Sequence, residues 1–86
     1  MKYPLSVNNF KGSLKNLAKE ISVMRYDKIV QLFSYLTKEF NNQSISDARK
    51  NRNKLAGMLK KIAECQNITA KEFKKIWEFC KPYMKK

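Results

Sequence analysis

The chain has 86 residues, and its 19 lysines and arginines against 7 aspartates and glutamates leave a formal net charge of +12. This length supports one domain with a small stability margin, because so short a chain buries only about 60–65% of the surface that its unfolded form exposes. The sequence contains no histidine, which excludes imidazole acid–base catalysis and histidine-ligated metal.

Composition also bounds the fold class and the compartment. A hydrophobic fraction of 43%, with only two glycines and two prolines, favours one compact all-α domain over a β-sandwich or a disordered chain. No run approaches about 18 apolar residues, and the first residues lack the apolar core of a signal peptide. We therefore expect a cytoplasmic protein with no membrane partner.

Residues 1–12 are predicted to be an irregular lead-in to a single helical domain, 1–86. Ser13 then caps a first helix, because its hydroxyl can accept a hydrogen bond from an N–H of the opening turn. This helix ends near Ser22, and its apolar residues share one face: Leu14, Leu17, Ala18 and Ile21.

A second helix is predicted to run to about Phe40, after a bend at Val23 and Met24, and it has the clearest helical periodicity. Its apolar stripe consists of Tyr26, Ile29, Val30, Phe33, Leu36 and Phe40. Asn41–Gln43 is expected to close this helix, because asparagine tolerates the left-handed conformation common at helix ends.

Two further helices complete the prediction. The third begins at Ser44–Asp47, which has the spacing of a capping box, and ends at Asn67. The fourth opens with the capping box Thr69–Glu72 and stops at Pro82. The inward-facing residues are predicted to be Ala48, Leu55, Leu59, Ile62 and Ala63 on the third helix, and Phe73, Ile76, Trp77 and Cys80 on the fourth. Short turns make neighbouring helices antiparallel, so we expect a small antiparallel bundle of four helices, or five.

The strongest functional signal is cationic. Six lysines and arginines and no carboxylate lie between residues 49 and 61, and residues 48–86 carry +9 of the net charge. Such an excess raises the local concentration of phosphate-bearing ligands. The candidate nucleic-acid-binding residues are Arg49, Lys50, Arg52, Asn53, Lys54, Gly57, Lys60, Lys61, Lys71, Lys74 and Lys75.

Gly57 and Arg52 each allow two interpretations. A mid-helix glycine costs about 1 kcal/mol relative to alanine, and close approach of a phosphate backbone to Gly57 would offset this cost. Alternatively, Gly57 packs against a neighbouring chain or is simply tolerated. Arg52 falls near the predicted apolar stripe, where it either pairs with a carboxylate such as Asp27 or Glu64, or forks onto a phosphate.

No residue pattern indicates catalysis, a cofactor or a metal site. Serines and threonines at the predicted helix starts are explained as caps, and no glycine-rich phosphate loop appears. Cys65 and Cys80 lack the CxxC spacing of a zinc site, and they are predicted to be free thiols because their places on two successive helices put their Cα atoms about 15 Å apart. We therefore expect a protein that is not an enzyme.

Two aromatic residues are candidates for a partner interface. Tyr35 lies opposite the face that carries Phe33, and Phe79 is off the inner stripe of its helix, so both are expected to be exposed. Phe73 and Trp77, at helical spacing, are predicted to be core residues instead.

The pattern from Ser46-Asp47-Ala48-Arg49 through Leu55-Ala56 to Phe73-Lys74-Lys75-Ile76-Trp77 resembles the small helical subunits of multi-subunit CRISPR effector complexes. The resemblance covers half of the chain. It implies copies stacked along one effector complex, basic residues that guide the nucleic-acid strands, and no catalytic role. We assign that contact to Arg49, Lys50, Arg52 and Lys54.

Two hypotheses from different classes remain open. In the first, the chain is a non-catalytic, sequence-nonspecific subunit of a larger nucleoprotein complex that neutralises DNA or RNA phosphates. Its partners would include other protein subunits and further copies of itself. In the second, it is a small protein-binding regulator, such as a phage or plasmid inhibitor or an immunity protein, that docks through its basic face. Salt separates the two, because nucleic-acid affinity falls steeply with salt whatever the sequence.

Overall fold

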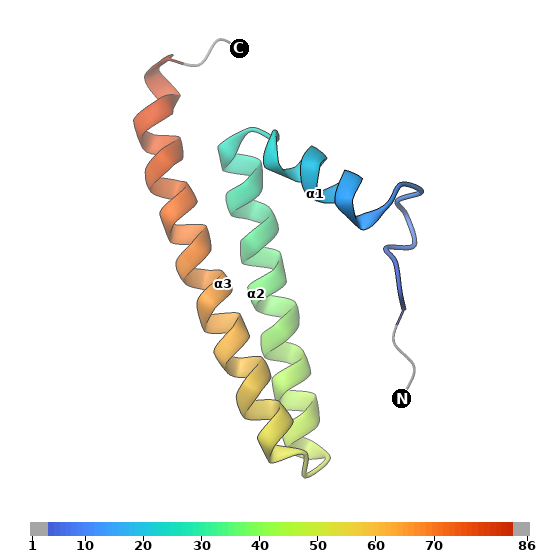
Figure 1. The fold of residues 1–86 in the computed structure, drawn as a ribbon. Helices are drawn as coiled ribbons and strands as arrows, with labels where there is room; N and C mark the ends of the chain where they lie inside the picture. Colours follow the sequence, from blue (N-terminus) through green and yellow to red (C-terminus); the bar gives the residue numbers. More distant parts are fainter. Residues whose placement is uncertain (1–3, 84–86) are drawn as a thin grey trace.

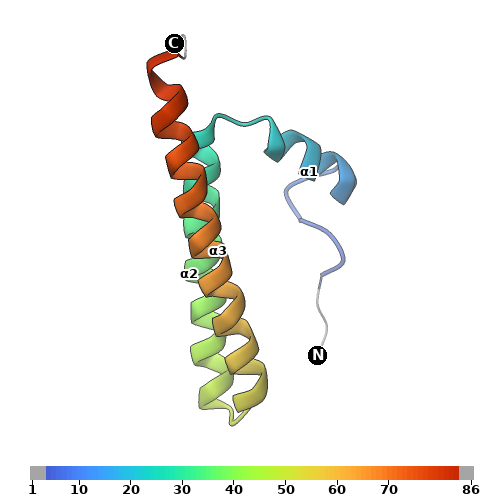
Figure 2. The same cartoon turned by 60° about the vertical axis from the view of Figure 1, so that its left-hand side comes forward.

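The computed structural model describes residues 4–83, and its regular structure in that range is helical throughout. Three α-helices follow one another, α1 (Leu14–Ser22), α2 (Tyr26–Arg49) and α3 (Asn53–Cys80), and a short 3-10 turn, η1 (Lys81–Tyr83), comes last. α2 and α3 form a long antiparallel hairpin, and α1 branches away from its open end (Figures 1 and 2). The all-α prediction is confirmed, whereas the count of four or five helices is not.

The N-terminal segment follows the prediction. Residues 4–12 contain no helix, as expected of a lead-in, while residues 1–3 lie outside the described range. α1 starts after Ser13, whose side-chain oxygen accepts a hydrogen bond from the Asn16 backbone N–H at 3.1 Å. Residues 23–25 then turn the chain into α2, at the predicted bend.

α2 continues past Asn41–Gln43, so the turn predicted there is wrong. Asn and Gln differ from alanine in helix propensity by at most about 0.7 kcal/mol per residue, which tertiary packing outweighs. That packing is visible at Ser44, which is buried and donates a hydrogen bond from its Oγ to the Ala56 carbonyl on α3 at 2.7 Å. The capping box predicted at Ser44–Asp47 is therefore also wrong, because the whole segment lies inside α2.

The real turn between α2 and α3 is Lys50–Arg52. Asn51 has a φ of 62°, the left-handed conformation that asparagine tolerates. Its N–H donates to the Ala48 carbonyl at 3.1 Å. The Arg52 N–H donates to the Asp47 carbonyl at 2.8 Å. These two bonds make a Schellman motif, which pairs two of the last carbonyls of α2 while the chain reverses.

α3 likewise passes without interruption through the predicted break at Asn67 and the predicted capping box at Thr69–Glu72, so both predictions are wrong. Instead of capping a helix, the Thr69 Oγ1 donates to the Cys65 carbonyl at 3.0 Å, one turn earlier. Continuity comes from a seven-residue repeat, which keeps one line of the helix against α2. The repeat consists of the buried residues Ala56, Ala63 and Ala70, followed by Trp77. α3 ends two residues before Pro82, as predicted.

The core is the seam between α2 and α3. Its buried hydrophobic residues are Ile29 of α2 and the three alanines of α3, whose small side chains allow a short distance between the helix axes. Half-buried Phe73 stacks on Phe33, with ring centroids 5.7 Å apart, and on Tyr26, at 6.3 Å, so it lies in the core as predicted. The inward positions predicted for Ile62 and Ile76 are wrong, because the repeat that faces α2 turns them outward, and Ala48 lies in the last turn of α2 rather than on the third helix. All three residues are exposed.

A cation–π contact joins Arg25 to Trp77 at the open end of the hairpin. The Arg25 guanidinium lies 5.6 Å from the centroid of the half-buried Trp77 ring. Arg25 also donates two hydrogen bonds to the Asp27 carboxylate, at 2.6 and 2.9 Å. These hydrogen bonds raise the pKa of Arg25 and lower the pKa of Asp27. The pair thus fixes Arg25 beside the aromatic ring.

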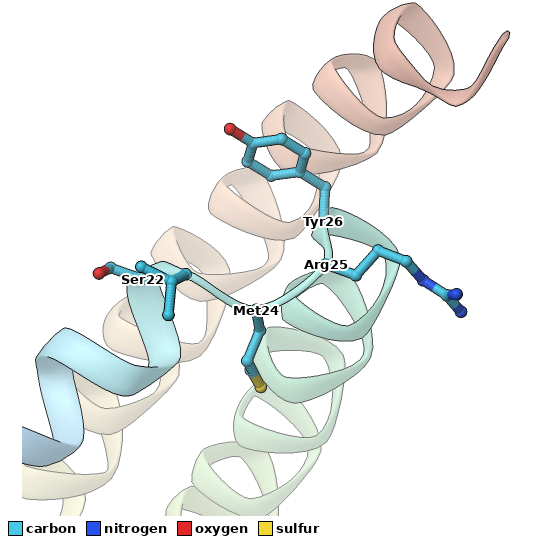
Figure 3. A pocket seen from close by; sticks show the side chains of 5 residues that line it. Ser22, Met24, Arg25 and Tyr26 are labelled. Atoms are coloured by element: carbon cyan, nitrogen blue, oxygen red, sulfur yellow. The ribbon is translucent and has the colours of Figure 1, made fainter. Parts of the chain in front are cut away.

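α1 makes few contacts with the hairpin, and its apolar face borders an open notch. The notch has a volume of about 360 Å³ and is lined by Ala18, Ile21, Ser22, Ile29, Phe33 and Phe73, from all three helices. A second hollow, of about 510 Å³, lies at the link between α1 and α2, where the side chains of Ser22 and Arg25 point to opposite sides (Figure 3). The apolar surface of α1 therefore remains largely open.

Candidate nucleic-acid interface

The predicted cationic residues divide between the tip of the hairpin and the length of α3. Arg49 is the last residue of α2, Lys50 is its C-cap, and Arg52 is the N-cap of α3. Arg49 and Lys50 are therefore not on the same helix as Lys54, contrary to the prediction, although the turn brings all of them to one end of the molecule (Figure 1). We call the following residues the tip cluster: Arg49, Lys50, Lys54, Lys60 and Lys61.

The side chains of the tip cluster lie in solvent and form no ion pair with the described part of the chain. All five residues are exposed, and within residues 4–83 none of them forms an ion pair. Two helix ends of opposite polarity meet at the tip, so their partial charges of about half a unit largely cancel. The positive potential there comes from the side chains, because residues 49–61 contain no carboxylate.

Arg52 is partly engaged by a carboxylate. Its Nη1 lies 3.4 Å from Asp47 Oδ1, and 41% of its side chain is exposed. The predicted carboxylate pairing is present, but the partner is Asp47 rather than Asp27 or Glu64. Arg52 also lies in the turn and not beside an apolar stripe. An exposed ion pair of this kind contributes about 0–1 kcal/mol to stability. A phosphate could therefore readily take the place of the Asp47 carboxylate beside Arg52.

From the tip, exposed lysines continue along α3. Lys54, Lys61 and Lys75 are separated by multiples of seven residues, so they share one row on the helix surface. The row is about 31 Å long at 1.5 Å per residue. Ile68, which is 60% exposed, occupies its remaining position. Lys60, Lys71 and Lys74 lie along one side of this row. Because α3 is unbroken, these lysines form one continuous ridge. The sequence instead predicts that they are divided between two separate helices.

The far part of the ridge is electrically balanced. Lys75 Nζ lies 2.8 Å from Glu72 Oε2. Three glutamates, at 64, 72 and 78, match the three lysines at 71, 74 and 75, so residues 62–80 carry no net charge. The predicted residues Lys71, Lys74 and Lys75 therefore add less positive potential than the tip cluster does.

Gly57 lies on the same open surface. No atom lies within 4 Å of the position that a Cβ would take there, and the residue has no positive φ. Neither packing within the chain nor backbone conformation therefore requires glycine at this position. Asn53, the first residue of α3, is exposed as well.

The two aromatic residues predicted for a partner interface are exposed but separate. Tyr35 is 66% exposed on α2, and Phe79 is 76% exposed near the end of α3. The Phe79 ring lies near the Tyr83 ring, with centroids 6.5 Å apart. In the described part of the chain no ring contact joins Tyr35 to Phe79, so they do not form one aromatic patch.

Sequence reasoning missed two features of α3. The first is an additional row of mostly exposed residues on α3, each of which directly precedes in sequence a residue that faces α2. We call it the outer seam: Leu55, Met58, Ile62, Cys65, Thr69, Glu72, Ile76 and Phe79. Its alternating spacing of three and four residues is readable in the sequence. The second feature is Gln66, whose Oε1 is buried without a hydrogen-bond partner among the described residues, and no sequence signal marks it.

No known protein family, curated protein or solved structure matches this chain. Within residues 4–83 there is no group of three or more His, Cys, Asp or Glu residues that could hold a metal ion. No helix in the same range is long and apolar enough to cross a membrane. The described part of the chain is an all-helical hairpin with a cationic tip.

Proposed function

We propose that the chain is a non-catalytic, sequence-nonspecific nucleic-acid-binding subunit that holds DNA or RNA by its phosphate backbone. The observation that carries the proposal is the tip cluster, whose five exposed cations have no ion pair with any described carboxylate. Binding of this kind needs phosphate neutralisation and no base contact. The ridge offers mainly lysines and lacks the mixture of Asn, Gln and Arg side chains that typically reads base edges.

Association is driven by counterion release. Each lysine or arginine that neutralises a phosphate frees a condensed counterion, and the gain in entropy favours the complex. Phosphates repeat about every 3.4 Å along one strand, so a row of about 31 Å spans about nine of them. Most of the affinity arises at the tip, because residues 62–80 carry no net charge.

Gly57 supports close approach at the base of the tip. The space above its Cα is open, so a phosphate backbone can come nearer to α3 there than it could over a side chain. Lys54, Lys60 and Lys61 flank this position on the helix surface, and their flexible stems can reach either side of a strand.

A role inside a larger cytoplasmic nucleoprotein complex is consistent with the small core. Only one isoleucine and three alanines are buried hydrophobic residues in the described part of the chain, so burial against other subunits would add stability. By resemblance, we extend the proposal to the small subunit of a CRISPR effector complex. Tyr35 and Phe79 are the candidate contacts with neighbouring subunits.

Charge reversal at the tip tests the proposal. Replacing Lys50, Lys54 and Lys61 by Glu lowers the net charge from +12 to +6. A matched control with the same final charge carries Glu at Lys11, Lys15 and Lys38, which are exposed elsewhere. Binding of labelled single- and double-stranded DNA and RNA of unrelated sequences would be followed by fluorescence anisotropy. We expect the tip variant to lose binding and the control to keep most of it, with unchanged melting for both.

The outcomes separate the hypotheses. Unchanged binding by the tip variant contradicts the proposed interface. Equal loss in both variants means that net charge, and not the tip, attracts the polyanion. If the wild-type chain binds no nucleic acid even at low salt, the protein-binding regulator that docks through its basic face becomes the better hypothesis, and a pull-down would be the next experiment.

A further inference from the structure

The outer seam of α3 has the spacing of a coiled-coil seam but no helix packed along it in this chain. Its residues alternate by three and four positions over 25 residues, from Leu55 to Phe79. Met58, Ile62, Ile76 and Phe79 in this seam are large hydrophobic residues exposed to solvent. A helix with two adjacent seams of this kind packs against two other helices. In the described structure α2 packs only along the adjacent row of α3 that contains Ala56, Ala63 and Ala70.

The chain exposes more surface than a compact monomer of its mass, and the excess is large enough to be buried in a dimer interface. The chain exposes 7619 Å², whereas a compact monomer of 10.2 kDa exposes about 5,300 Å². Its radius of gyration is 15.6 Å, against about 12 Å expected for this length. The extended lead-in contributes part of the excess of about 2,300 Å², yet a stable dimer needs to bury only about 800 Å² on each partner.

We infer that the outer seam binds the outer seam of a second copy of this chain in the antiparallel direction. The two hairpins then form one four-helix core around a two-fold axis. Almost the whole seam is uncharged, since Glu72 is its only charged residue. A second copy therefore meets an apolar surface that is complementary to its own.

The order of residues along the seam fits antiparallel pairing. In one register, with the spacing continued from Phe79 to Tyr83 in η1, the large apolar residues from Met58 onward face other apolar residues, and the polar residues meet in the middle. The facing pairs are Met58 with Tyr83, Ile62 with Phe79, Cys65 with Ile76, and Thr69 with Glu72 of the second copy. A hydroxyl next to a carboxylate can hydrogen-bond. A parallel pairing would instead place Glu72 against Glu72, two like charges in an apolar interface.

Antiparallel pairing also accounts for Ile68. This isoleucine stands in the lysine row next to the outer seam and is 60% exposed. In the same register Ile68 lies only about 3 Å along the axis from Lys75 of the second copy, so a lysine at this position would add a like-charge repulsion. Lys61 then flanks Lys75 of the second copy, a like-charge pair that salt screens. The dimer should therefore become tighter as salt rises.

The notch beside α1 lies next to the same seam. Phe73 lines the notch, and Thr69 and Ile76 are its neighbours on the helix surface at positions i−4 and i+3. A helix packed on the outer seam would thus run past the open apolar face of α1. Leu14 on that face is 60% exposed and would gain a partner.

A substitution in the seam tests the surface. Sedimentation velocity should give a dimer for the wild-type chain at micromolar or higher concentration. Ile62→Asp should raise the dimer dissociation constant about 100-fold, because two apolar contacts are lost in each dimer. Ile45→Asp is the matched control, since Ile45 is similarly exposed on α2 but is not part of the seam, and it should leave the mass unchanged. Circular dichroism verifies that both variants are folded.

Cross-linking tests the direction of pairing. Ile68→Cys, with Cys65 and Cys80 changed to Ser, should give a dimer with a short bismaleimide only if the helices are antiparallel. The natural Cys65, with Cys80 changed to Ser, should form a disulfide between copies only if they are parallel, because the antiparallel register separates the two thiols by about 16 Å along the axis. A disulfide through Cys65 would overturn the antiparallel register.

A wild-type chain that stays monomeric at all concentrations and salt levels would overturn the inference. Dissociation by both Ile62→Asp and Ile45→Asp would also overturn it, because the seam would then not be the contact. Neither result bears on nucleic-acid binding, which is measured separately and weakens with salt, whereas self-association should strengthen.

Discussion

Gln66 is the residue whose replacement should stabilise the protein most. It is spaced by seven residues from Leu59 and Phe73, beside the alanine repeat that faces α2, and its Oε1 is buried with no hydrogen-bond partner in the described part of the chain. A buried polar atom without a partner destabilises the folded state by the full free energy of removing it from water, about 1–3 kcal/mol. Gln66→Leu removes that group and adds apolar contact at nearly the same helix propensity.

We expect Gln66→Leu to raise the free energy of unfolding by about 1–3 kcal/mol. For a domain of this size, each kcal/mol raises the melting temperature by about 4–8 °C. Thermal and urea unfolding followed by circular dichroism would measure the change. Asn67→Leu makes a similar chemical change at the next, exposed residue and should gain less than about 0.5 kcal/mol, from propensity alone.

A neutral or destabilising Gln66→Leu would refute the reasoning, because Gln66 would then have a partner or would not face α2. A larger gain from Asn67→Leu than from Gln66→Leu would have the same meaning. It would indicate that the helix surface facing α2 is displaced by one residue from the one described.

Four further predictions concern the Ser44 hydrogen bond to α3, the turn at Asn51, the exposed Gly57 and the Arg25–Asp27 ion pair. Ser44→Ala should lower the free energy of unfolding by about 0.5–1.5 kcal/mol in urea denaturation, through loss of the hydrogen bond to α3. At the left-handed Asn51, Gly should be tolerated and Val should destabilise by at least about 1 kcal/mol in the same assay. Gly57→Ala should raise stability by about 0.5–1 kcal/mol and weaken nucleic-acid binding in anisotropy, whereas unchanged binding would mean that no phosphate approaches there. Because hydrogen bonding to Arg25 lowers the pKa of Asp27, the stability that this pair contributes is present above the ordinary aspartate pKa and is lost as pH falls through the lowered value. NMR titration of the carboxyl group should show this lowered pKa, and Asp27→Asn should remove that part of the acid dependence.

The helix class and the outer limits of the helical region could be predicted from local signals. Ser13 has the side chain of an N-cap and is one, and Pro82 follows the end of α3. Both signals act through a single turn of backbone, so neighbouring helices do not change their effect.

The internal breaks could not be predicted from the same local signals. Asn41–Gln43 and Asn67 resemble helix ends, yet packing between α2 and α3 keeps both segments helical. The repeat of Ala56, Ala63, Ala70 and Trp77 crosses the predicted break at Asn67. This seven-residue spacing indicates one continuous helix. The true turn at Asn51 has the same residue type as the false ones. Its position depends on where the repeats of both helices stop.

The charge pattern predicted which residues form the candidate interface, whereas their arrangement depends on the fold. Arg49, Lys50, Lys54, Lys60 and Lys61 are exposed, as expected for a cationic run that contains no carboxylate between residues 49 and 61. The separation of the cationic residues into a tip cluster and a balanced ridge depends on the turn at Lys50–Arg52. Ion pairs such as Arg52 with Asp47 depend on the same turn, so the sequence alone could not assign them.

The most direct test of the central proposal is the salt dependence of nucleic-acid binding by the wild-type chain. If the five cations of the tip cluster neutralise five phosphates, a plot of log affinity against log salt should have a slope of about −4.5 on duplex DNA and about −3.5 on single strands, whatever the sequence. A slope near zero, or no binding at low salt, would contradict the proposal.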